Sequence, residues 1–154
     1  SAQTGLDNPG EAVLTSGMSV TDYIASVQLN REQVRAKNKE SLMSIINSTG
    51  IEEAAKQQAI QDMLELTEIA EKENAAETLL MARGFADPVV SVSSDQVDVV
   101  INASSITDQQ DGVDVVICLE SLDDTQRTQI EDIVKRKTER SADQIVISLL
   151  NLQE

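Results

Sequence analysis

The second half of the chain contains a tandem repeat. Residues 95–108 read DQVDVVINASSITD, and residues 111–124 read DGVDVVICLESLDD. Each copy carries a β-branched run of the length of one strand, with an acidic residue, Asp98 or Asp114, just inside its start. Repeating a single strand widens a sheet without building a new core. The pattern therefore predicts a sheet in this half of the chain. It favours a role in protein assembly over a catalytic role.

The two copies are predicted to pair with each other. Asp111-Gly112 lies between them and is typical of a tight hairpin turn, so we expect residues 97–101 and 113–117 to be neighbouring antiparallel strands. Alternate residues then share a face, which should pack on the following helix through Ile130, Ile133 and Val134. That face is wholly β-branched and comprises Val97, Val99, Ile101, Val113, Val115 and Ile117.

Composition excludes several classes of function. The chain has 27 acidic and 12 basic residues, which give a net charge of −15. A protein that binds nucleic acids or anionic membranes needs a basic surface, so the charge argues against both kinds of partner. Its aromatic residues are Tyr23 and Phe85, so the core must be aliphatic and aromatic stacking platforms for bases are excluded. Cys118 is the single cysteine, which rules out an internal disulfide.

No apolar run reaches the roughly 18 residues that span a bilayer, and the chain lacks an initial Met. We therefore expect an excised piece whose upstream anchor could have been removed.

The first half of the chain is predicted to be a helical hairpin. Residues 1–18 are small and polar and are expected to be a disordered lead. Helices are expected at about 20–47 and 51–83, joined by four polar residues that favour an antiparallel hairpin. Gly84 is placed to end the second helix. Two capping boxes are predicted to open the helices, Ser19 with Asp22 and Thr49 with Glu52.

The second half is predicted to be an open sheet with one helix. A third capping box, Ser121 with Asp124, should open this helix. Strands are expected at 88–93, 96–103, 113–120 and 144–152, with Ser94-Asp95 as the first turn. The order αα-βββ-αβ indicates an α+β fold with the helix on one face of the sheet. We divide the chain into a lead (1–18), a helical arm (19–84) and an α+β unit (85–154).

The residues offer little for catalysis. There is no histidine, which removes Ser-His-Asp systems and most catalytic zinc sites, and no glycine-rich phosphate loop. Asp98 and Asp114 could sit on neighbouring strands and act as the paired carboxylates of a hydrolase. The favoured interpretation is that each is a solvated acid at the start of its strand, where its charge discourages aggregation. Residues 108–112 are acidic yet lack the ligand spacing of a calcium loop. We expect no enzyme, cofactor or metal; an acidic-residue hydrolase and a small-molecule sensor remain the alternatives.

A partner-binding surface is the preferred hypothesis. The first helix has a concentration of basic residues together with Tyr23, and Tyr and Arg are frequent interface anchors. An alternative of equal weight to partner binding is that Tyr23 caps the hydrophobic end of the helical hairpin. The candidate interface residues are Tyr23, Arg31, Arg35, Lys37, Lys39, Asp98 and Asp114.

Several motifs, in order, resemble a known family. These are the run from Tyr23 to Lys37 (YIASVQLNREQVRAK), AETLL leading to RGF, VDVVI, an ESL helix start, and QIEDIV. Together they resemble the soluble domain of the stage III sporulation protein AH family, over about residues 23–152. Each motif alone is weak, and their order and spacing carry the resemblance.

The resemblance implies a fold, a location and a partner. Members carry a small ring-building motif, an αββαβ unit like those in type III secretion basal-body rings, so the unit here should be of ββαβ type with an extra strand. An N-terminal helix anchors them in the mother-cell membrane, and the soluble domain faces the space between mother cell and forespore. There it binds stage II sporulation protein Q of the forespore membrane, and the pair is proposed to form a ring-shaped channel. The family unit has one VDVVI strand; the first copy here therefore looks inserted and is expected to be dispensable for folding.

Overall fold

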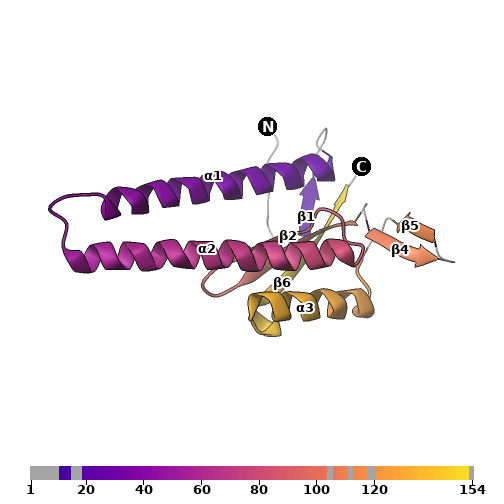
Figure 1. Ribbon diagram of the computed structural model, residues 1–154. Coiled ribbons are helices and arrows are strands. Elements are labelled where there is room, and N and C mark those ends of the chain that lie inside the picture. The colour runs from indigo at the N-terminus through magenta and orange to yellow at the C-terminus, as the bar shows by residue number, and fades with distance from the viewer. Residues whose placement is uncertain (1–10, 15–18, 104–105, 111–112, 118–120, 153–154) are drawn as a thin grey trace.

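Two long antiparallel helices dominate the computed structural model, which describes residues 11–14, 19–103, 106–110, 113–117 and 121–152. Helix α1 (Val20–Ile46) and helix α2 (Glu53–Ala82) form a hairpin whose outer end projects well beyond the sheet (Figure 1). The Oγ of Ser19 accepts the N–H of Asp22 at 3.0 Å, as expected for an N-cap. The predicted Thr49 box is wrong, because α2 begins after Glu52 with no side-chain cap.

The end of α2 follows the prediction. Gly84 adopts a left-handed φ of 96°, and the N–H of Phe85 bonds back to the carbonyl of Leu80 at 3.1 Å. This is a Schellman ending, in which the residue after the cap must have positive φ and the next one returns an apolar side chain to the helix. Phe85 and Leu80 are both buried in the main core. The turn therefore directs the chain from the helical arm straight into the sheet.

The main sheet has four strands in the order β1-β6-β3-β2. Strand β3 (Val97–Asn102) pairs antiparallel with β2 (Val89–Val92) and parallel with β6 (Ile145–Leu152). A parallel pair needs a crossover, and helix α3 (Asp124–Thr138) lies in the β3-to-β6 connection. The α+β class is confirmed, and the observed ββαβ unit matches the expected one.

Both faces of the sheet are covered. On one face, side chains of β2, β3 and β6 pack against α2 and α3; the core members include Ala76, Leu80, Val97, Val99, Ile101, Ile130, Ile133 and Val134. The predicted contact between the first repeat copy and α3 is therefore confirmed. On the other face, Val89 and Leu150 meet the first turns of α1 at Val20 and Ile24. Because α2 supplies core residues, the arm and the sheet unit share one core; the boundary at residue 84 stays a prediction.

The predicted pairing of the two repeat copies is wrong. The second copy forms strand β5 (Val113–Ile117), which pairs with β4 (Ile106–Gln110) in a separate two-stranded sheet. A strand was not predicted at β4, yet it lies directly before the Asp111-Gly112 segment and is the nearest available partner. The first copy, β3, is central in the main sheet, so it is a core strand and not an inserted extension. Residues 118–120, with Cys118, lie outside the described residues.

Two further expectations need correction. Residues 11–14, assigned to a disordered lead, form strand β1 (Glu11–Leu14), which pairs parallel with the end of β6; residues 1–10 and 15–18 lie outside the description. Helix α3 is capped by Asp123, whose carboxylate accepts the Gln126 N–H at 2.7 Å while the Gln126 amide returns to Asp123 N–H. The predicted Ser121 box fails because Asp123 forms the same reciprocal pair closer to the apolar run.

Candidate functional site

Four charged side chains join the arm to the sheet. Arg31 and Arg35 lie one turn apart on α1, and Glu73 and Glu77 lie one turn apart on α2. Arg35 Nη2 donates to Glu73 Oε2 at 2.6 Å, and Arg31 Nη2 donates to Glu77 Oε1 at 3.2 Å. Arg31 Nη1 also lies 3.6 Å from Glu73 Oε1. We call these four residues the ion-pair cluster.

The ion-pair cluster also binds the backbone of β2. Oε2 of Glu73 accepts the N–H of Val92 at 2.8 Å, and Oε2 of Glu77 accepts the N–H of Val90 at 3.5 Å. Nη1 of Arg31 donates to the carbonyl of Val90 at 2.8 Å. The Glu73 side chain is 1% exposed and the two arginines 17% and 18%. A buried carboxylate is costly unless it is paired, and here the guanidinium and the backbone N–H supply that pairing.

Burial changes the acidity of this cluster. It raises the pKa of Glu77, an effect that hydrogen bonding to Arg31 partly opposes. The hydrogen bond to Glu73 raises the pKa of the Arg35 guanidinium, so this cation is held charged. The described carboxylates of the cluster are thus committed to holding α1, α2 and β2 together. The arrangement is suited to rigidity and leaves no carboxylate directed at a substrate.

The predicted interface residues do not form one surface. Arg31 and Arg35 point inward into the ion-pair cluster, and Tyr23 is half-buried against the α1 side of the sheet. Lys37 and Lys39 are exposed on α1, but residues two apart on a helix face different directions. The role of these residues in partner binding stays a prediction; Lys37, Lys39 and Asp98 are exposed, and Tyr23 is half-buried.

The two repeat aspartates are held in different sheets. Asp98 is exposed on β3 and accepts a hydrogen bond from Gln96, whereas Asp114 is on β5, opposite Gln109 in the two-stranded sheet. The expectation that the repeat could place them on neighbouring strands is therefore wrong. The hydrolase alternative loses the carboxylate pair on which it was based.

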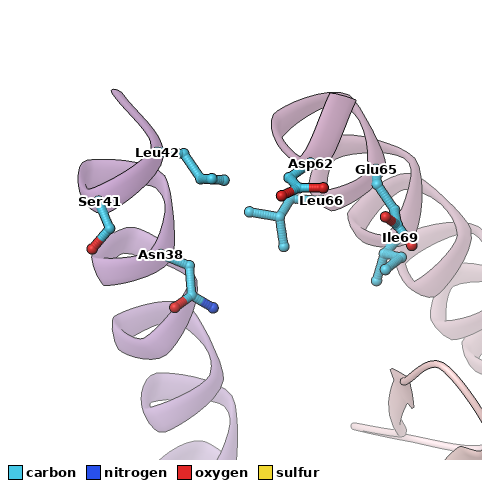
Figure 2. Close-up of a pocket in the computed structure, with 7 residues that line it drawn as sticks. All are labelled: Asn38, Ser41, Leu42, Asp62, Glu65, Leu66 and Ile69. Atoms are coloured by element: carbon cyan, nitrogen blue, oxygen red, sulfur yellow. The ribbon is translucent and has the colours of Figure 1, made fainter. Parts of the chain in front are cut away.

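A groove of about 370 Å³ separates the two helices in the outer half of the hairpin. Leu42 of α1 and Leu66 of α2 point toward one another across it, with Asp62 and Glu65 beside Leu66 (Figure 2). The groove is open, and Ser41, Asp62 and Glu65 are among its lining residues; Asp62 accepts a hydrogen bond from Gln58 of its own helix. All of its lining residues belong to α1 and α2, and none belongs to the sheet.

Sequence reasoning missed the ion-pair cluster as a buried site. It recognised the basic residues of the first helix but assigned them to a partner-binding surface. The available signal was the spacing. Arg31 and Arg35 are four residues apart, as are Glu73 and Glu77, so each pair lies on one side of its helix.

In the described part of the chain, no group of three or more acidic, Cys or His residues is placed to hold a metal ion. No helix among the described residues is both long and apolar enough to cross a membrane.

A two-helix arm anchored by buried ion pairs on a ββαβ sheet defines the class of this protein, an α+β domain with a helical extension. The chain belongs to the SpoIIIAH-like protein family, whose model matches residues 2–111 and 109–147. The two matched segments overlap between the copies of the repeat. The family resemblance predicted from the motifs is thereby confirmed.

Individual relatives agree with the family assignment. The chain is 27% identical over 82 residues to stage III sporulation protein AH of Bacillus subtilis (strain 168), a match that covers 53% of this chain and 38% of the relative. Its fold is similar to a chain in the "Structure of the SpoIIQ-SpoIIIAH pore forming complex", with a TM-score of 0.66 and 21% identity over 83% of this chain and 96% of that one. At this identity the structural likeness establishes the fold.

Proposed function

We propose that this chain is a non-enzymatic structural module of a sporulation complex, and that it binds a SpoIIQ-like protein of the forespore membrane. The observation that carries the proposal is the family membership combined with the fold of a chain from the SpoIIQ-SpoIIIAH pore forming complex. The described site supports it, because its buried charges are used to fix the arm on the sheet. A rigid arm of this kind suits a scaffold that presents surfaces to other proteins.

The proposal extends to location and assembly. A domain of this family would lie in the space between mother cell and forespore, held by an N-terminal anchor outside the sequence given. There, this chain and its partner would form a ring-shaped channel. The acidic net charge of −15 supports a protein partner over nucleic acid.

Size analysis of a mixture tests the proposal. The chain is combined with the soluble domain of the SpoIIQ-like protein from the same organism and examined by size-exclusion chromatography with light scattering. The proposal expects a new species whose mass contains both proteins. Two separate peaks at about 100 µM of each protein, where a micromolar complex would be well populated, would contradict it.

Charge-reversal variants locate the contact. Lys37→Glu and Lys39→Glu change opposite sides of α1 and leave the ion-pair cluster intact, so each can be compared with the other. If the partner contacts α1, one variant should weaken binding and slow association while the other does not. Tyr23→Ala adds a test at the sheet end of the helix. Unchanged affinity for all three variants would remove α1 from the interface.

A further inference from the structure

The ion-pair cluster covers the hydrogen-bonding edge of a strand. β2 is the last strand of the main sheet on its side, and it pairs with β3 along its other edge. In an antiparallel pair, successive residues direct their N–H and C=O groups alternately toward and away from the neighbouring strand. The contacts of Val90 and Val92 with α1 and α2 side chains show that these two residues point away from β3. Their backbone groups form the outer edge of the sheet.

The arm supplies what a neighbouring strand would supply. Glu73 and Glu77 accept from the N–H groups of Val92 and Val90, and Arg31 donates to the carbonyl of Val90. Two acceptors and one donor thus occupy consecutive edge positions in place of a strand's carbonyls and N–H. An uncovered valine-rich edge is a template for pairing with another chain, and natural proteins close such edges.

We propose that the ion-pair cluster seals a latent strand-pairing edge at β2, and that the partner this edge would accept is β2 of a second copy of the chain. The edge is self-complementary. A two-fold axis through Ser91 places Val90 of one copy opposite Val92 of the other, so the N–H of each meets the carbonyl of the other. The position of the arm therefore decides whether two copies can join their main sheets. This inference does not depend on the sporulation partner proposed above.

A disulfide probe measures edge opening. Ser91 is central in β2 and partly exposed, and it occupies a non-hydrogen-bonded position in the two-fold pair, where side chains are closest. The probe protein is the full chain carrying Ser91→Cys and Cys118→Ser. In this background the sealed edge should give little disulfide-linked dimer under mild oxidation.

Two matched pairs of substitutions separate hydrogen bonding from charge. Glu73→Met with Glu77→Met removes the acceptors at nearly constant side-chain length, and we expect dimer formation to accelerate by about tenfold or more, the effect of losing one to two hydrogen bonds. Glu73→Gln with Glu77→Gln keeps a carbonyl acceptor at each position, and the dimer should form at close to the background rate.

The possible results decide between the alternatives. The seal is overturned if the methionine pair retains its helical circular dichroism and links no faster than the background, or if the background itself links as fast as the methionine pair. If the methionine pair fails to fold, amide exchange of the unaltered chain gives the answer. The N–H groups of Val90 and Val92 should then exchange as slowly as that of Val99 in the central strand. Exchange at the rate of an open edge would contradict the proposal.

Discussion

Arg35 and Glu73 are 38 residues apart in sequence, yet Nη2 of Arg35 lies 2.6 Å from Oε2 of Glu73. The same carboxylate oxygen accepts the N–H of Val92 at 2.8 Å. One buried acid therefore ties α1, α2 and β2 at a single point. This contact explains why the inner half of the hairpin is fixed on the sheet while the groove between Leu42 and Leu66 is open further out.

Removing Glu73 should be strongly destabilising. Glu73→Ala leaves Arg35 and the N–H of Val92 without their partner, and breaking a buried pair from one side costs about 3–5 kcal/mol. Urea unfolding followed by circular dichroism measures the change. Asp132→Ala is the matched control, because it breaks the exposed pair with Arg136 and should cost less than about 1 kcal/mol. Equal losses for the two variants would contradict the burial of the cluster.

Glu77 should make a contribution to stability that falls as pH rises. Burial raises its pKa in the folded chain above the ordinary 4.5, so the folded state binds this proton more tightly than the unfolded state. The contribution is present in full below the unfolded pKa and is lost as pH rises through the folded pKa. The stability of the unaltered chain minus that of Glu77→Gln should therefore decrease between about pH 4 and pH 7. Urea midpoints across that range measure it, and a difference that increases with pH would contradict the prediction.

Gly84 should resist replacement by residues with a Cβ. Its φ of 96° is accessible to glycine, and Ala at such a position destabilises by about 1 kcal/mol or more. Asn tolerates the left-handed region better, so Gly84→Asn should lose less stability than Gly84→Ala. Thermal unfolding of both variants measures the order. A smaller loss for Ala than for Asn would exclude backbone strain as the cause.

The two repeat copies should differ in their importance for folding. Deleting residues 96–111 removes the central strand β3, whose Val97, Val99 and Ile101 are fully buried, and should abolish cooperative unfolding. Replacing residues 106–117 by a flexible Gly/Ser segment removes β4 and β5 and should leave the main sheet intact, because the two sheets share no strand pairing. Circular dichroism and urea unfolding compare the variants. A folded 96–111 deletion would restore the idea that the first copy is an extension.

The helices and most strands were predictable because their signals are local. Gly84, the β-branched run at β3 and the stripe Ile130, Ile133 and Val134 each carry their own periodicity or turn chemistry. Strand pairing was not predictable from the repeat. Identical runs do not indicate whether a strand pairs with its copy or with a nearer weak strand such as β4, since that choice depends on the whole sheet.

The ion-pair cluster was visible in part. Opposite charges on the two helices are evident in the sequence, but their burial depends on β2 closing over Glu73, a contact between segments 19 residues apart that follows from tertiary packing. Charged residues are exposed in most proteins, so the general rule predicts a solvent-exposed Glu73, whereas this side chain is buried. The expected basic face of α1 is reduced for the same reason, because Arg31 and Arg35, two of its four cations, pair with Glu77 and Glu73 inside the fold.

Titration of the chain with the soluble domain of the SpoIIQ-like protein from the same organism tests the central claim most directly. Isothermal calorimetry should give a saturable isotherm with a fixed stoichiometry, and Glu73→Gln, which keeps a carbonyl acceptor for the Val92 N–H, should bind almost as well. An absence of binding heat at two temperatures, with both proteins folded and no co-elution in size analysis, would contradict the account of this chain as a partner-binding structural module.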